Sequence, residues 1–235
     1  MIKMILFDLD GTLLPMDQDL FIKAYFGGIA KRLANYGYEP NKLIQGILDG
    51  TMAMVNNDGS KTNEEVFWDK FASIFGVDAK SDEPYFNEFY INDFDKIQAV
   101  CGFNPLARKV LDESKNLCLR TVLATNPIFP RIATQKRINW AGLTVEDFEL
   151  YTTYENSSYC KPSLKYYTSI IDSLGVKPEE CLMVGNDVTE DMVTEKLGMK
   201  VFLVTDCLIN RLNDDISIYP HGSLSDLLEY IKTLV

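Results

Sequence analysis

The sequence is poor in the residues that histidine- and cysteine-based sites need. Among 235 residues there is one histidine, His221, which lies between a proline and a glycine in a turn-like stretch. The five cysteines are far apart, form no CxxC pair and are odd in number. This distribution argues against a zinc site or a disulfide framework and favours buried, reduced thiols. Ser–His and Cys–His nucleophile pairs are disfavoured too, because one histidine would have to serve alone.

The sequence also lacks long apolar runs and an excess of basic residues. No apolar run approaches the roughly 18 residues that span a bilayer, and the N-terminal run is short and broken by Asp8 and Asp10, unlike a signal peptide. We therefore expect a cytoplasmic protein. The 23 Lys and Arg residues against 34 Asp and Glu give a net charge of −11. This charge opposes binding to nucleic acid or anionic membranes, but permits a small phosphorylated substrate held by a local cation.

Short apolar runs recur along the chain and predict buried strands. Four are clear, MILF (4–7), RTVLA (120–124), ECLMV (180–184) and KVFLV (200–204), and FELYTTY (148–154) is a less regular fifth. They do not alternate with polar residues, which is typical of strands buried on both faces of a parallel sheet. Helical patterns lie between them at 105–115, 163–174, 189–197 and 223–234. The alternation predicts a doubly wound, Rossmann-like α/β fold.

Residues 16–100 interrupt this alternation. They contain at least three helical stretches, at 19–37, 42–55 and 63–76, and no clear strand. We therefore expect a core domain of residues 1–15 and 101–235 with an inserted α-helical cap domain of residues 16–100. The insertion holds 14 of the chain's 27 aromatic residues, which we interpret as the core of a small helical bundle rather than as a binding site. Residues 56–60 (NNDGS) are typical of a solvated loop between two helices.

Polar residues follow the predicted strands at the points where they end. They are Asp8 and Asp10, then Thr125 and Asn126, then Lys161, and finally Asp187 and Asp191. In open α/β sheets the ligand crevice lies at the carboxyl ends of the strands, so these groups should converge there. Four aspartates facing one lysine need a further cation. A site that has only oxygen ligands, few of them from the protein, suits Mg²⁺ bound together with waters and a substrate phosphate.

Four motifs, taken in order, resemble those of the haloacid dehalogenase (HAD) superfamily. They are DLDGT at 8–12, the threonine at 125, Lys161 with the following proline, and GNDVTED at 185–191. The helical insertion between the first two motifs resembles the α-helical (C1) cap of that superfamily. By this resemblance the chain is a phosphatase rather than a dehalogenase, because the superfamily's dehalogenases lack an Asp two positions after the nucleophile.

The resemblance implies a Mg²⁺-dependent phosphatase that forms an aspartyl-phosphate on a small phosphorylated metabolite. Asp8 would be the nucleophile and Asp10 the general acid and base, while Thr125 and Lys161 would bind the phosphoryl group. The Asp8 carboxylate, the Asp10 backbone carbonyl and Asp187 would hold Mg²⁺. The remaining assignments are Asp191, which would act through metal-bound waters or the lysine, and Thr12 and Asn126, which would support substrate binding.

Other interpretations of the same residues remain open. A phosphomutase or phosphotransferase would pass the phosphoryl group to another alcohol, and a non-catalytic regulatory protein would only bind phosphate. The substrate and the oligomeric state are open as well. The spacing of Arg131, Lys136 and Arg137 predicts a solvated basic helix face rather than a phosphate site.

Overall fold

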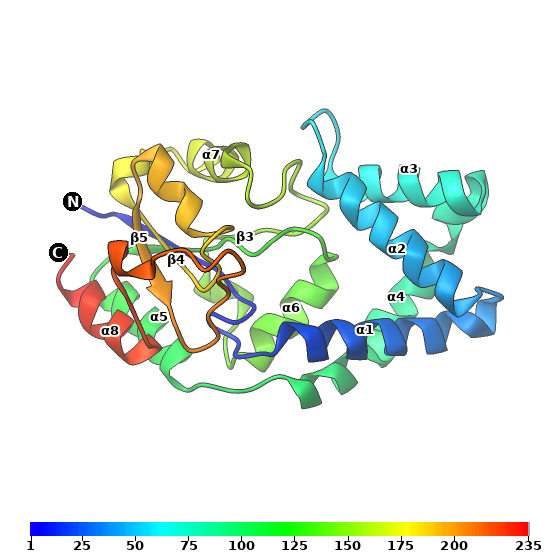
Figure 1. The fold of residues 1–235 in the computed structure, drawn as a ribbon, viewed down its shortest axis with the longest axis horizontal. Coiled ribbons are helices and arrows are strands. Elements are labelled where there is room, and N and C mark those ends of the chain that lie inside the picture. The colour runs from blue at the N-terminus through cyan, green and yellow to red at the C-terminus, as the bar shows by residue number, and fades with distance from the viewer. Residues whose placement is uncertain (235) are drawn as a thin grey trace.

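A six-stranded parallel sheet forms the centre of the computed structural model, which describes residues 1–234. The strands are β1 (Met4–Phe7), β2 (Arg120–Leu123), β3 (Leu150–Tyr151), β4 (Cys181–Gly185), β5 (Lys200–Val204) and β6 (His221–Gly222). Their order in the sheet is β3-β2-β1-β4-β5-β6, so β1 lies between β2 and β4 (Figure 1). The reversal of strand order at β1 creates the crevice predicted from the sequence.

Helices cover both faces of the sheet, as its two-sided hydrophobic pattern requires. Ile5 and Phe7 of β1 point to the face covered by α5 (Leu106–Asn116), α6 (Arg131–Trp140) and α8 (Leu224–Lys232). Met4 and Leu6 point to the opposite face, which α7 (Leu164–Ser173) covers. The doubly wound α/β fold is thereby confirmed.

Three local expectations need correction. The fifth strand is only the two-residue β3, and the short edge strand β6, which contains the single histidine, was not predicted. The helix expected at 189–197 is a 3-10 helix over Met192–Leu197. The Asp187 carboxylate accepts hydrogen bonds from the backbone N–H groups of Thr189 and Glu190, which offers this segment an alternative to α-helical bonding. Only two of the five cysteines, Cys160 and Cys181, are fully buried, although none of the five forms a disulfide.

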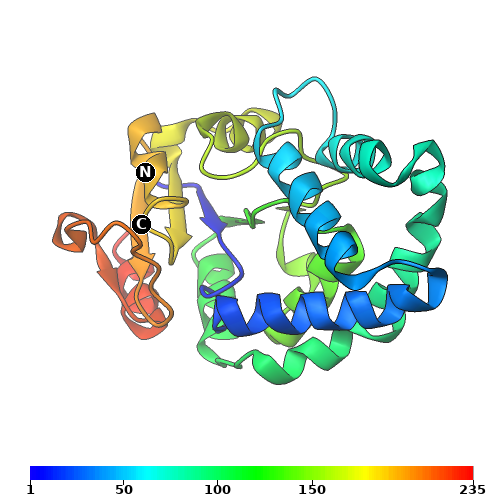
Figure 2. The same cartoon turned by 45° about the vertical axis from the view of Figure 1, so that its right-hand side comes forward.

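The segment between β1 and β2 is helical throughout its regular parts. It contains α1 (Gln18–Leu33), α2 (Pro40–Val55), α3 (Asn63–Phe75) and α4 (Glu83–Asn92), joined by loops and short 3-10 helices. Figure 2 shows these helices gathered on one side of the sheet, away from both ends of the chain. Residues 56–60 lie in the loop between α2 and α3, as expected. The proposed domain boundaries stay a prediction.

The insertion is fastened to the core at several places. Its last segment is bonded to α6 through Lys136 and Asp95, and two further attachments involve Met16 and Asn63. Where the chain leaves and re-enters the core, Met16 forms a bridge with Cys101, and the N–H of Gly102 donates to the carbonyl of Pro15 at 2.7 Å. Asn63, at the start of α3, is completely buried. Its side-chain amide donates to the carbonyl of Pro127 and to the sulfur of Cys160, and its N–H donates to the carbonyl of Ser157.

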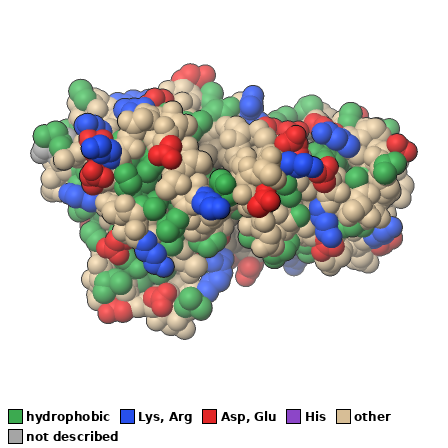
Figure 3. Space-filling model, turned by 90° about the horizontal axis from the view of Figure 1, so that it is seen from above, with side chains coloured by type: hydrophobic (Ala, Val, Ile, Leu, Met, Phe, Trp, Pro, Cys, Tyr) green, Lys and Arg blue, Asp and Glu red, His purple; other side chains and the backbone are tan. Residues whose placement is uncertain are grey.

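Charged side chains are mixed on the surface. Of the described residues, no helix is long and apolar enough to cross a membrane. On the face shown in Figure 3, basic and acidic side chains are interspersed rather than separated into large patches of one sign.

An ion cluster around the buried Asp147, at the edge of the sheet, gives a pH-dependent contribution to stability. The Asp147 carboxylate accepts from both Nη atoms of Arg108, from Lys115 Nζ at 2.6 Å and from the N–H of Thr144 at 2.8 Å. Burial alone would raise the pKa of Asp147, but these hydrogen bonds, with Arg108 foremost, lower it well below its ordinary value. A lowered pKa stabilises the fold above the pKa of the unfolded chain, and the effect is lost as the pH falls.

We expect Asp147→Asn to lower the free energy of unfolding at pH 7 by about 2 kcal/mol. The difference in unfolding free energy between variant and native chain should shrink as the pH falls from about 5 towards 2. At such pH values Asp147 of the native chain takes up a proton when the chain unfolds, which favours the unfolded state. Urea unfolding at a series of pH values measures this. Asp112→Asn is the control, because Asp112 is mostly exposed and contacts Arg108 only at 3.4 Å. A difference that stays constant with pH would contradict the assignment.

Candidate active site

The first motif leaves β1 through a tight turn that brings Asp8 into the crevice. Gly11 has a φ of +89°, and a Cβ atom there would lie 2.3 Å from the Asn186 side chain, so this turn requires glycine. The Thr12 hydroxyl donates to Asp8 Oδ2 at 2.9 Å and to Asn186 Oδ1 at 3.1 Å. Asp8 is therefore held in one orientation by its own turn.

Lys161 joins two of the aspartates. Its Nζ lies 2.8 Å from Asp8 Oδ1 and 2.6 Å from Asp191 Oδ1, and its side chain is 1% exposed. Burial disfavours the charged ammonium, but the carboxylates of Asp191 and Asp8 outweigh this and raise the pKa of Lys161 well above its ordinary value. Asp191 can approach because Gly185 has no side chain, since a Cβ there would lie 2.0 Å from Asp191 Oδ2.

Asp10 is paired with a cation that sequence analysis placed elsewhere. Arg137 was expected on a solvated helix face, but its side chain is 1% exposed and its Nη1 donates to Asp10 Oδ2. Its guanidinium also lies over the Phe129 ring, 4.5 Å from the centroid. One side of α6 packs against the core and cannot face water. Arg137 lies on that buried side. The prediction of a solvated face was therefore wrong for Arg137.

The second carboxyl oxygen of Asp10, Oδ1, is buried and has no hydrogen-bond partner among the described residues. Burial raises the pKa of Asp10 above its ordinary value, although Arg137 opposes this. A carboxyl group with a raised pKa and one unpartnered oxygen is suited to general acid catalysis.

The fourth motif supplies two further acidic groups. Asp187 Oδ2 accepts from Nη1 of Arg211 at 2.7 Å, and Arg211 also donates to Gln18 of α1 at 3.2 Å. Glu190 accepts from the Asn126 side chain at 3.3 Å, and burial raises its pKa. Neither Arg211 nor Glu190 was identified from the sequence, although Glu190 lies inside the motif GNDVTED and could have been.

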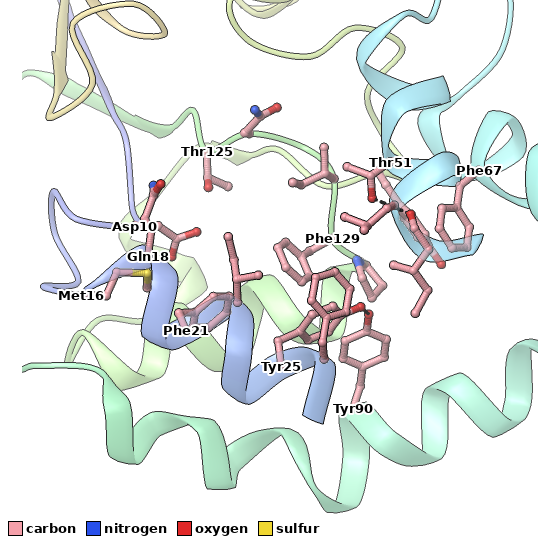
Figure 4. Close-up of a pocket in the computed structure, with 18 of the residues that line it drawn as sticks. Asp10, Met16, Gln18, Phe21, Tyr25, Thr51, Phe67, Tyr90, Thr125 and Phe129 are labelled. Carbon is pink, nitrogen blue, oxygen red and sulfur yellow. Dashed lines mark hydrogen bonds between the residues drawn. The ribbon is translucent and has the colours of Figure 1, made fainter. Parts of the chain in front are cut away.

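The remaining expected residues lie around the same crevice. Thr125 and Asn126 line the cavity beside Asp8 and Asp10, and Figure 4 shows the Thr125 side chain on the side of the cavity that carries Asp10. The backbone carbonyl of Thr125 accepts from the hydroxyls of Thr152 and Tyr166. Thr12 is 1% exposed and contacts Asp8. Its role in substrate binding stays a prediction, as do the other assigned roles.

The donor set of this crevice fits a hard divalent cation. Five carboxylates, those of Asp8, Asp10, Asp187, Glu190 and Asp191, converge with three cations, those of Lys161, Arg137 and Arg211. The excess of negative charge and the oxygen-only donors suit Mg²⁺. The described residues contain no group of three or more acidic, His or Cys side chains close enough to enclose a metal. Mg²⁺ is commonly bound by one or two carboxylates together with waters and substrate phosphates.

A cavity of about 280 Å³ extends from these carboxylates into the helical insertion. Asp8, Asp10 and Thr125 lie at the core end, and residues of α1, α2, α3 and α4 form the opposite walls (Figure 4). The arrangement places the carboxyl groups of Asp8 and Asp10 and the buried ammonium of Lys161 at the core end of a partly open cavity. Carboxyl groups beside a fixed positive charge are suited to group transfer.

Comparisons with solved structures agree with the fold. A HAD phosphatase from Thermococcus onnurineus is similar over 98% of each chain, with 19% identity and a TM-score of 0.58. A 2-haloacid dehalogenase from Pseudomonas syringae pv. Tomato DC3000 is similar over 100% of each chain, with 16% identity and a TM-score of 0.65. At such low identities the likeness shows the fold alone.

Sequence comparisons identify the family to which the chain belongs. "Protein SUPPRESSOR OF QUENCHING 1, chloroplastic" from Arabidopsis thaliana is 24% identical over 157 residues, which is 66% of this chain. The chain spans 15% of that relative's length. Residues 2–194, which include every residue of the crevice named above except Arg211, match the haloacid dehalogenase-like hydrolase family. The chain belongs to the haloacid dehalogenase-like hydrolases.

Proposed function

We propose that this chain is a Mg²⁺-dependent phosphatase that hydrolyses a small phosphate monoester through an aspartyl-phosphate on Asp8. The observation that carries the proposal is the pair of carboxyl groups at the end of β1. Asp8 is held by Thr12 and Lys161, while Asp10 presents a buried, unpartnered oxygen. A nucleophile and an acid on the same turn are what a two-step hydrolysis of an unactivated ester requires.

In the first step an Asp8 oxygen forms a bond to phosphorus while the bond between phosphorus and the alcohol oxygen breaks. Asp10 gives its proton to that alcohol oxygen, and the alcohol leaves. In the second step Asp10 takes a proton from water, whose oxygen attacks phosphorus and releases Asp8 and inorganic phosphate. Lys161 neutralises charge near Asp8, and Arg137 positions Asp10. Thr125, which lines the cavity beside Asp8, would donate to a phosphoryl oxygen.

Mg²⁺ would be held by the carboxylates of Asp8 and Asp187 and by the backbone carbonyl of Asp10. When bound, it neutralises charge on the phosphoryl group. Asp187 would exchange its contact with Arg211 for the metal, and such a partly exposed ion pair costs little to break. Asp191 would act indirectly, by holding Lys161.

Release of phosphate from 4-nitrophenyl phosphate and acetyl phosphate tests the proposal. We expect turnover with millimolar Mg²⁺, loss of turnover with excess chelator, and recovery when Mg²⁺ is restored. An equal rate in chelator would contradict the metal dependence. Formation of a halide ion from 2-chloropropionate, with no phosphate release from any ester, would assign the site to dehalogenation instead.

A phosphomutase remains the second candidate, because a cavity that holds one alcohol beside Asp8 can also hold a second alcohol that accepts the phosphoryl group. The products distinguish them, since a mutase gives an isomeric phosphate ester and little inorganic phosphate. The expected cytoplasmic location and the absence of nucleic-acid partners stay predictions.

A further inference from the structure

Aromatic side chains form one third of the residues that line the cavity. Nine of the side chains that line it are Phe, Tyr or Trp, contributed by α1, α3 and α4 of the insertion and by two core loops. Figure 4 shows Phe21, Tyr25, Phe67, Tyr90 and Phe129 around the central space. Aromatic filling of the bundle explains some of the insertion's rings, but these line the space in front of Asp8 and Asp10. The sequence interpretation of the rings as core alone was therefore incomplete.

The rings hold one another in place. Phe129 packs edge-on against Phe21 at 6.1 Å and against Tyr25 at 5.2 Å between ring centroids. The hydroxyls of Tyr25 and Tyr90 are hydrogen-bonded to each other at 2.9 Å. These rings present faces and edges to a ligand. Such surfaces suit an apolar or aromatic group, while Gln18, Thr51 and Asn87 add amide and hydroxyl groups to the insertion side of the lining.

The insertion side of the cavity offers no cation to a second anionic group. Among the described residues that line the cavity there is no Lys, Arg or His. The cations around its core end are Lys161, Arg137 and Arg211, which pair with Asp8, Asp10 and Asp187. The one charged group on the insertion side of the lining is Glu83, which would repel an anion. A carboxylate or a second phosphate would therefore lose its hydration without a partner, and this is costly.

The cavity is also small. Its volume of about 280 Å³ lies at the lower end of the range of roughly 300–1,000 Å³ that is usual for ligand sites. Part of this space would hold the phosphoryl group and its surrounding water. What remains suits an alcohol of about one ring.

We propose that the phosphatase proposed above acts on a monoester whose alcohol is uncharged and apolar, with about one aromatic ring. This inference rests on the proposed function, and it excludes phosphorylated hydroxy acids and bisphosphates as preferred substrates. The ring would lie against Phe21, Tyr25 and Phe129, with the ester oxygen towards Asp10.

A set of primary alkyl phosphates tests the proposal with leaving groups of one type. We compare 2-phenylethyl phosphate with phosphoglycolate, glycerol 3-phosphate and 2-aminoethyl phosphate, each with saturating Mg²⁺. We expect kcat/KM for the phenylethyl ester to exceed the others by about 10- to 100-fold. A higher kcat/KM for any of the other three esters would overturn the proposal.

A binding measurement separates failure of this inference from failure of the proposed function. By calorimetry with Mg²⁺ we compare the binding of 3-phenylpropylphosphonate and 3-phosphonopropionate. They are the analogues of 2-phenylethyl phosphate and phosphoglycolate in which a CH₂ group replaces the ester oxygen. Tighter binding of the phenyl compound supports the cavity assignment even if no ester is hydrolysed. Absence of hydrolysis together with such binding would overturn only the phosphatase proposal. Equal or tighter binding of the carboxylate compound, or no binding of either, overturns the inference whatever the hydrolysis result.

Adding a cation to the cavity wall should change this preference. Thr51 of α2 lines the cavity, and Met52 on the same helix is 59% exposed. We expect Thr51→Lys to raise the ratio of kcat/KM for phosphoglycolate over 2-phenylethyl phosphate by about 10-fold or more. Met52→Lys adds the same charge outside the cavity and should leave the ratio unchanged.

A second cavity variant guards against misfolding of the first. Asn87→Lys places the charge on α4, on a different wall of the cavity. Circular dichroism identifies which variant is folded, and the ratio is measured on that one. An unchanged ratio in a folded cavity variant, or an equal change in Met52→Lys, would overturn the inference.

Discussion

We expect Asp8→Asn to lower kcat for phosphate release by roughly 10⁴-fold or more. An amide has the shape of the carboxylate but is a very poor nucleophile, so the first bond to phosphorus does not form. The fold should persist, because the amide oxygen can still accept from Lys161 and Asp191 still pairs with that ammonium. Phosphate release, together with acid-stable labelling by ³²P-phosphate ester, measures the loss of both turnover and the aspartyl-phosphate.

Asp19→Asn is the matched control for this change of charge. Asp19 is exposed in the first turn of α1, and its replacement should leave kcat within twofold of the native value, since surface substitutions rarely matter. Retained phosphate release or labelling in Asp8→Asn would show that another residue is the nucleophile.

The second large effect concerns Lys161. We expect Lys161→Met to lower kcat/KM by roughly 10²- to 10³-fold, because the transferring group loses its nearest fixed positive charge. Without Mg²⁺ the free energy of unfolding should also fall by about 3–5 kcal/mol, since Asp8 and Asp191 would remain buried without a cation. Phosphate-release kinetics and urea unfolding measure the two effects.

A double variant separates the two effects of Lys161. Adding Asp191→Asn to Lys161→Met removes one of the unpaired carboxylates, so stability should partly recover while activity does not. Lys109→Met, on the exposed side of α5, is the control and should change neither quantity. Full activity in Lys161→Met, or recovery of activity in the double variant, would show that Lys161 has only a structural role.

The parts of the site that lie directly after strands could be predicted from the sequence. A short unbroken apolar run followed by Asp8 or Thr125 shows both that a buried strand ends there and which side chain it delivers. Parallel strands bring such ends to one edge, so the convergence of Asp8, Thr125, Lys161 and Asp191 follows from topology. The doubly wound sheet followed from the same runs.

The cations that complete the site could not be predicted in this way. Arg137 lies on a helix among other basic residues, and helical spacing alone does not say which side faces the crevice. Arg211 lies in the long connection between β5 and β6, where no periodicity marks an inward side chain. Their positions depend on how whole elements pack, which involves contacts over more than a hundred residues for Arg137 and Asp10.

The same limit applies to the cavity. A pattern of aromatic residues on amphipathic helices predicts an apolar interior, but it does not separate rings that touch only one another from rings that face a space. Phe71, completely buried within the insertion, and Phe21, which lines the cavity, have similar sequence surroundings. Only the three-dimensional arrangement distinguishes them.

The attachment of the insertion at Asn63 has a consequence for the timing of the proposed turnover. Asn63 ties α3 to the loops that follow Thr125 and precede Lys161. Any swing of the helices that widens the cavity on the Asn63 side must first detach this fully buried amide from both loops. In the proposed reaction, a swing that releases the alcohol would therefore also loosen the segments that carry Thr125 and Lys161, so that alcohol and phosphate would leave in the same opening.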